Sequence, residues 1–243
     1  MHLKRYEFKY FVSEDVYKQL LEAMEPYIEP DGFAASCPNY RYTVHSLYFD
    51  SPSRLYYDEK LDGKKTRHKI RVRCYTENFY DSEAYYWEIK RKDQNMISKS
   101  RVEISRDELN YMLRYNFLSC PEHFLNGNQM KREITEELLY YSNRHCLMPA
   151  VFILYEREAY MSPLDDTIRI AFDRDVQGNS YFSSGITQQI NWSPAFDKSV
   201  IFEIKIRGLL PFWLHNLIRE HGLYNESISK YCGGLDSAIA HYA

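Results

Sequence analysis

The sequence lacks the features that mark several common classes of protein. Its 243 residues include only 9 glycines, 9 prolines and 5 cysteines. So little glycine and proline argues against a disordered or collagen-like chain. An odd number of cysteines without C-x-x-C spacing argues against a disulfide framework and a zinc cluster, and favours a reduced, cytoplasmic setting.

Long apolar runs and the usual nucleotide-binding loops are also missing. No stretch approaches the roughly 18–20 apolar residues of a spanning helix, and no apolar segment follows the first charged residues, so we expect neither a membrane segment nor a secretion signal. The chain has no GxxxxGK[ST] loop and no kinase signature. Any chemistry on nucleotides would therefore need a different fold.

Overall positive charge is absent, but positive charge is concentrated in one segment. The formal net charge is -3, which argues against binding a polyanion through bulk charge. Residues 60–106, however, contain 13 basic and 7 acidic side chains, whereas residues 1–59 contain 6 basic and 10 acidic ones. The rest of the chain thus masks a strongly basic region.

Aromatic side chains are abundant, with 23 tyrosines and 13 phenylalanines, which favours strands. No repeat or linker divides the chain, so we expect one domain over residues 1–243. Alternating or β-rich patterns predict eight strands, at 3–11, 41–50, 67–75, 84–92, 97–105, 150–161, 167–174 and 200–207. Helices are predicted after Ser13, at 106–115, 130–143 and 211–221, and after Gly234. The expected class is α+β, an antiparallel sheet with helices packed outside.

The predicted strands carry basic residues on one face. Arg67, Lys69, Arg71 and Arg73 alternate with Ile70, Val72 and Cys74, and the same pattern places Glu88, Lys90, Lys92, Lys99, Arg101, Glu103, Arg157, Arg169, Glu203 and Lys205 on polar faces. In a single strand such a face would simply be solvated. Repeated over several strands it is unfavourable on an open surface, because like charges repel across a ladder.

Eight antiparallel strands can close a barrel with a small lumen. If helices cover the apolar outside, the charged face lines the lumen, which then suits a polyanion. Guanidinium and ammonium groups bind phosphate oxygens, and glutamates suit a hard cation such as Mg²⁺ or Mn²⁺. These are the groups that phosphoryl transfer requires.

An ordered series of short motifs resembles a known family. The series comprises Arg5-Tyr6-Glu7-Phe8-Lys9-Tyr10, Ser46-Leu47-Tyr48-Phe49-Asp50, Lys60-Leu61, Arg71-Val72-Arg73, Glu88-Ile89-Lys90, Tyr155-Glu156-Arg157, Arg169-Ile170, Glu203-Ile204-Lys205 and Ser229-Lys230-Tyr231. In this order it is similar to the VTC domain, the polyphosphate polymerase domain of the CYTH-like triphosphate tunnel metalloenzymes. The resemblance implies an eight-stranded antiparallel tunnel that transfers the γ-phosphate of ATP onto inorganic polyphosphate.

The resemblance also implies roles for individual residues. Those expected to act on the transferred phosphate are Lys9, Arg71, Arg73, Arg157, Arg169 and Lys205, and those expected to bind phosphate or ATP are Lys60, Lys90, Tyr155, Ser229 and Lys230. Glu203 matches the family's ligand for Mn²⁺ or Mg²⁺. Strand phase adds Glu7 and Glu88 as metal or water-organising carboxylates; the alternative for both is an internal ion pair with a neighbouring cation.

Two departures from related patterns affect the prediction. Arg5 stands where related triphosphatases have the first glutamate of Glu-x-Glu-x-Lys, which favours a polymerase over a hydrolase. Ser227 stands where a basic residue is frequent, which keeps open a polyphosphate-binding module without turnover. The partners expected are ATP and polyphosphate, together with a membrane protein if the product is translocated, and not duplex nucleic acid.

Asp50 and the histidines are not expected to bind metal. Asp50 is expected to cap the turn that follows it. No histidine pair has the spacing of metal ligands.

Overall fold

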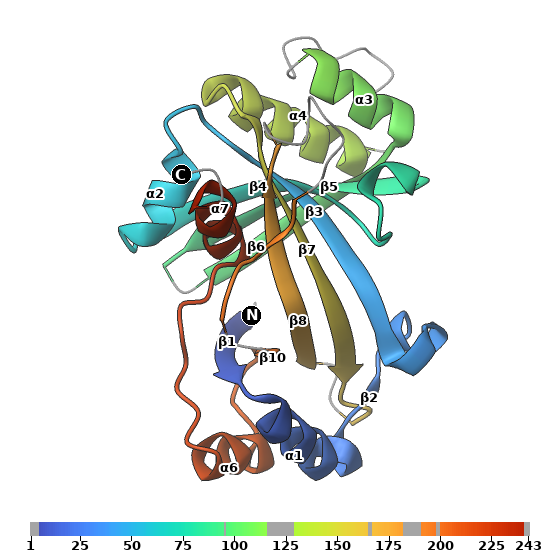
Figure 1. The fold of residues 1–243 in the computed structure, drawn as a ribbon, viewed down its shortest axis with the longest axis vertical. Coiled ribbons are helices and arrows are strands. Elements are labelled where there is room, and N and C mark those ends of the chain that lie inside the picture. Colours follow the sequence, from blue (N-terminus) through green and yellow to red (C-terminus); the bar gives the residue numbers. More distant parts are fainter. Residues whose placement is uncertain are drawn as a thin grey trace.

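The computed structural model describes residues 5–94, 96–115, 129–164, 167–181, 191–197 and 200–240 (Figure 1). One antiparallel sheet forms its centre, with strand order β1-β10-β8-β7-β3-β4-β5-β6. The bounds are β1 Arg5–Val12, β3 Arg41–Asp50, β4 Thr66–Cys74, β5 Ala84–Asp93, β6 Met96–Ser105, β7 Met148–Met161, β8 Ile168–Ser180 and β10 Val200–Arg207. Two short strands, β2 Glu29–Pro30 and β9 Ser193–Pro194, pair with β7 and β8. All eight predicted strands are present.

The strongly curved antiparallel sheet of eight principal strands with helices packed around it confirms the expected fold class, although its backbone ladder does not close. Within the described part of the chain, β1 and β6 are the two edges and share no backbone ladder. An ion pair spans this seam instead, because Lys90 in β5 donates to Glu7 in β1 at 2.6 Å.

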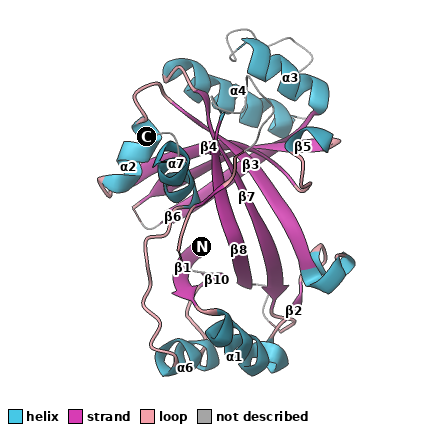
Figure 2. Ribbon diagram, viewed as in Figure 1, coloured by secondary structure: helices cyan, strands magenta, loops and turns pink. Residues whose placement is uncertain are grey.

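Most of the helices lie outside the curved sheet (Figure 2), whereas the start of α7 lines the inner cavity with Lys230. The helices are α1 Glu14–Met24, α2 Leu55–Leu61, α3 Arg106–Tyr115, α4 Gln129–Arg144, α6 Phe212–Glu220 and α7 Lys230–Ala240. Single 3₁₀ turns are η1 Glu25–Tyr27, η2 Ala34–Ser36, η3 Pro38–Tyr40 and η4 Phe79–Asp81. None of the helices in these residues has the length and hydropathy that a bilayer crossing requires.

Ser13 and Asp50 both accept backbone hydrogen bonds at the start of a helix, as the sequence predicts. Ser13 accepts a hydrogen bond from the Val16 amide at 3.3 Å and begins α1. Asp50 accepts from the amides of Ser51, Tyr56 and Tyr57, as its predicted capping role requires. The segment that Asp50 caps is a full helix, α2, rather than the short turn expected.

The strands form two apolar clusters on their outward faces, and a third cluster under α7 on the cavity side, where Tyr155 also lines the cavity. Trp87 of β5 packs with Leu109 of α3 and Leu138 of α4. Phe172 and Phe202 pack under α1 and α6, and Ile153 packs under α7. Burial of these apolar residues orients each strand, so that the alternate charged residues face inward.

Helix α7 begins at Lys230, four residues before Gly234, after which the helix was predicted. Its two internal glycines would weaken an isolated helix, but here they allow close packing. A Cβ built on Gly178 of β8 would lie 2.1 Å from the carbonyl oxygen of Gly234. This contact seats the first turn of α7, with Ser229 and Lys230, against the sheet.

We therefore expect Gly178→Ala to lower the free energy of unfolding by about 1–3 kcal/mol, because the added methyl meets backbone that cannot rotate away. Urea unfolding followed by circular dichroism measures this loss. Gly32→Ala is the matched control, since nothing lies within 4 Å of a Cβ at that position. Equal midpoints for the two variants would contradict the packing argument.

Candidate functional site

The inner face of the sheet encloses one cavity of about 730 Å³. Eleven basic side chains line it, against three acidic ones, Glu7, Asp31 and Glu203. The basic residues are Lys9, Lys69, Arg71, Arg73, Lys90, Lys99, Arg101, Arg157, Arg169, Lys205 and Lys230. The cavity is therefore strongly cationic although the whole chain is slightly acidic.

Strand β4 shows how the alternation builds this wall. Lys69, Arg71 and Arg73 line the cavity, while Ile70 and Val72 between them are fully buried in the outer core. Arg71 donates to the phenol of Tyr48 at 2.8 Å, and Arg73 donates to the phenol of Tyr155 at 3.2 Å. Two tyrosines thus hold the guanidinium groups in place.

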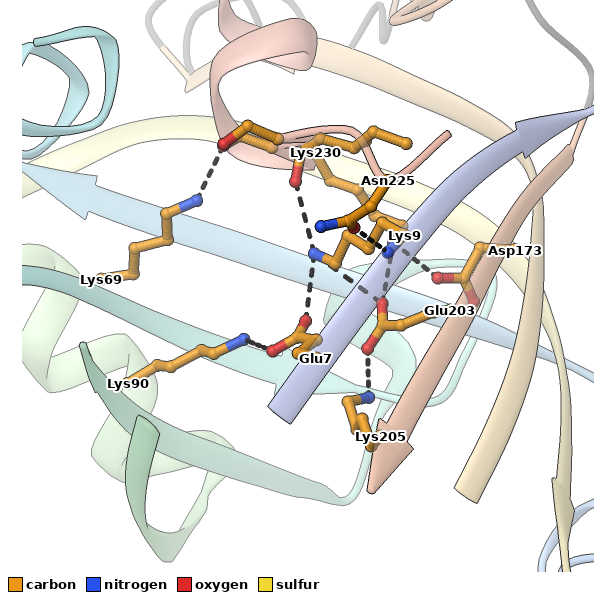
Figure 3. Close-up of polar contacts among 12 residues, drawn as sticks. Glu7, Lys9, Lys69, Lys90, Asp173, Glu203, Lys205, Asn225 and Lys230 are labelled. Carbon is orange, nitrogen blue, oxygen red and sulfur yellow. Dashed lines mark hydrogen bonds and ion pairs between the residues drawn. The ribbon is translucent and has the colours of Figure 1, made fainter. Parts of the chain in front are cut away.

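A cluster of carboxylates and lysines lies where β1 meets β10 (Figure 3). Lys9 lies 3.1 Å from Glu7 and 3.9 Å from Glu203, which also pairs with Lys205. Burial alone would raise the pKa of Glu7, but Lys9 and its other cationic neighbours hold it well below the usual range. The same opposition, led by Lys205, lowers the pKa of Glu203, so both carboxylates are ionised at neutral pH.

Asp173 is a second anchor, which the sequence reasoning missed. Its side chain is fully buried and accepts two hydrogen bonds from Arg157, at 2.6 and 2.8 Å. Lys230 of α7 lies 2.5 Å from the same carboxylate. Asp173 shares the strand phase of Arg169 and Ala171, so the alternation could have identified it.

Twelve of the fourteen predicted site residues line the cavity; the two that do not are Lys60 and Glu88. Lys60, on α2, donates to the carbonyl and the hydroxyl of Ser227 at 3.0 and 2.7 Å. It thereby places a positive charge beside the serine that stands where a basic residue was expected. Lys69, Lys99, Arg101 and Tyr48 line the cavity and were not predicted as site residues, although the first three lie on the predicted basic faces.

Glu88 is completely buried behind Arg71, which donates to it at 2.8 Å, and it also pairs with Lys99. Arg71 and its other cationic neighbours hold the pKa of Glu88 well below its usual range despite burial. This geometry matches the internal ion pair that was the alternative to a metal role.

The carboxylates that could hold a divalent cation are Glu7 and Glu203. In the described residues no three acidic, histidine or cysteine side chains are grouped as a preformed metal site. Mg²⁺, however, commonly takes only one or two carboxylates and completes its shell with phosphate oxygens and water. Two hard oxygen donors inside a phosphate-sized cationic cavity fit that mode of binding.

Lys69 differs from most cavity cations because no carboxylate of the described residues lies within 4 Å of it. Its ammonium donates to the Ser229 hydroxyl at 2.7 Å. Burial, with repulsion from Lys9, Lys90 and Lys60, lowers the pKa of Lys69 to about 7. Burial and Arg71 likewise lower the pKa of Lys99 to about 7.

Comparisons with known proteins agree with this fold. A model of the VTC domain matches residues 4–239. A Hippeastrum candidate adenylyl cyclase, described as having a dominant triphosphatase activity, superposes with a TM-score of 0.50 at 12% identity, covering 95% of this chain and 94% of that one. A candidate adenylate cyclase from Bacillus halodurans gives 0.51 at 12% identity, covering 94% and 96%. No curated protein matches the chain.

We expect Lys69 to make anion binding depend on pH. Its ammonium is charged below pH 7 and neutral above, so the affinity for tripolyphosphate should fall as pH rises from 6 to 8. Arginine at position 69 stays charged throughout. The fold-decrease in affinity between pH 6 and pH 8 should therefore be about ten times smaller in Lys69→Arg than in the wild type. Calorimetric titrations at both pH values measure the difference, and the titration of the ligand itself cancels between the two proteins. Identical pH dependence would show that Lys69 does not contact the anion.

Proposed function

The chain belongs to the VTC domain family, and from this we propose that it is an ATP-dependent polyphosphate polymerase. It would transfer the γ-phosphate of ATP to the end of an inorganic polyphosphate chain and release ADP. The observation that carries the proposal is a cavity that, in the described part of the chain, is lined by eleven basic side chains and holds two ionised glutamates.

The excess of positive charge calls for an anionic ligand. Many of the lining cations already pair with Glu7, Glu88, Asp173 or Glu203, which hold them in position. Four others have no carboxylate within 4 Å in the described part of the chain: Lys69, Arg73, Arg101 and Arg169. Phosphate oxygens are suitable partners for these groups, because guanidinium donates paired hydrogen bonds and ammonium supplies compact charge.

The reaction that fits this cavity is an in-line displacement. A terminal oxygen of the polyphosphate chain, already ionised, bonds to the γ-phosphorus while the bond from that phosphorus to the β,γ-bridging oxygen breaks. The bridging oxygen leaves with ADP, and no protein base is needed. Arg71, Arg157 and Lys9 would stabilise the negative charge that develops on the transferred group.

Glu203, together with Glu7, would hold the divalent cation. Such an ion neutralises charge on phosphate oxygens. The residues themselves bind and orient the phosphates: Arg71 is fixed by Glu88 and Tyr48, and Arg157 is fixed by Asp173. Fixed donors need no reorganisation as the transition state forms.

Hydrolysis of triphosphate is the second candidate, favoured by Glu7. This carboxylate is ionised inside the cavity and could orient a water molecule as the attacking group. The Hippeastrum relative of the same fold is described as a triphosphatase. Products distinguish the two reactions, because only a polymerase lengthens the chain.

We expect purified protein with ATP and Mn²⁺ to form long polyphosphate, resolved on a polyacrylamide gel, and Glu203→Gln to lower the yield about 100-fold. Glu22→Gln on exposed α1 is the matched control and should retain full activity. Tripolyphosphate binding and thermal melting verify that Glu203→Gln remains folded.

Free phosphate without chain growth would replace the polymerase by the hydrolase. Tight polyphosphate binding without turnover, unaffected by EDTA and weakened steeply by salt, would instead indicate a binding module. An undiminished yield from Glu203→Gln would remove Glu203 from the site.

A further inference from the structure

One end of the cavity is rich in aromatic side chains. Phe33, Tyr42, Tyr75 and Tyr86 all line it, and we call them the aromatic rim. Phe33 contacts Tyr42 with ring centroids 4.7 Å apart and Tyr75 at 5.3 Å, and Tyr75 contacts Tyr86 at 5.8 Å. The Phe33 ring is 48% exposed, so the cluster reaches the molecular surface.

Strand β4 links this rim directly to the phosphate-binding wall. Tyr75 follows Arg73, Arg71 and Lys69 at two-residue intervals on the cavity side. At about 3.3 Å per residue, Arg73 lies about 7 Å and Arg71 about 13 Å along the strand from Tyr75. A ligand with a flat apolar group at one end and phosphates at the other therefore meets the rim and the cations together.

The surroundings of the rim suit a nucleoside. The Arg101 guanidinium lies over the Tyr86 ring, 4.4 Å from its centroid, and offers a second flat cationic surface. Asp31 also lines this end, and its carboxylate accepts from the amides of Phe33 and Ala34 at 3.1 and 2.8 Å. These bonds fix the turn that presents Phe33, and they place a hydrogen-bond acceptor where sugar hydroxyls can donate.

We propose that the aromatic rim binds the base of the donor nucleotide by stacking, with Phe33 and Tyr75 as the principal contacts. The inference rests on the proposed function in taking a nucleoside triphosphate as the donor. It fixes the direction of that substrate: the base lies at the rim and the inner phosphates at Arg73. The γ-phosphate lies at Arg71 and points toward Lys69 and Ser229. Stacking does not depend strongly on which base is present, because every base has a π face.

The test compares two ligands that differ in the base. Binding of ATP and of tripolyphosphate is measured by calorimetry in EDTA, so that no turnover occurs. Phe33→Ala should weaken ATP binding about tenfold and leave tripolyphosphate binding within about twofold. Phe33→Trp should restore ATP binding, because it restores a flat ring.

Phe212→Ala is the matched control, since this phenylalanine is 79% exposed and lies outside the cavity. It should change the affinity for neither ligand. Tyr75→Leu supplies an independent test if Phe33→Ala does not fold. Equal weakening of both ligands, or no change in ATP binding, would overturn the subsite.

The outcome is separable from that of the polymerase assay. A wild-type protein that hydrolyses ATP without chain growth would refute the polymerase and still show the selective loss of ATP binding. A polymerase in which Phe33→Ala binds ATP normally would refute only the base subsite.

Discussion

Mutual neutralisation of buried ions is the constraint on which this structure depends. Asp173, Glu203, Glu88 and Glu7 each lie between at least two basic side chains on the inner face of the sheet. Isolated charges at such depth would cost several kcal/mol each, so carboxylates among the cations make a cationic cavity compatible with folding. The same pairs restrain the arginine and lysine side chains in the positions from which phosphate can be bound.

The carboxylates do not neutralise all of the positive charge in the cavity. Among the described residues, eleven basic and three acidic side chains line it. Cations that pair with carboxylates are held in place, whereas Lys69, Arg73, Arg101 and Arg169 retain capacity for an anionic ligand. Burial without a carboxylate partner also brings the pKa of Lys69 to about 7, close to neutrality. One cationic wall thus contains both side chains that carboxylates hold in position and side chains without a carboxylate partner among the described residues.

Packing outside the sheet controls the geometry inside it. The outer apolar clusters beneath α1, α3, α4 and α6 orient the strands, and a shift of one residue would exchange every charged side chain with an apolar one. Helix α7 contributes directly, because the Gly178–Gly234 contact seats its first turn and brings Lys230 to Asp173. The open seam between β1 and β6 is spanned by Lys90 and Glu7, so even the edge of the fold is held by the same charge pairing.

The sequence by itself determined the α+β class, the eight principal strands, and the placement of Lys69, Arg71 and Arg73 opposite Ile70 and Val72, because alternation along a strand is a local property. It also determined the capping by Ser13 and Asp50, which depends on neighbouring residues. Only the tertiary structure decided that Asp173 joins Arg157 to Lys230, that Glu88 lies behind Arg71, that Lys60 contacts Ser227, and that Phe33 meets Tyr75. These pairs come from separate elements, and their contacts depend on sheet curvature and helix docking, which no local pattern specifies.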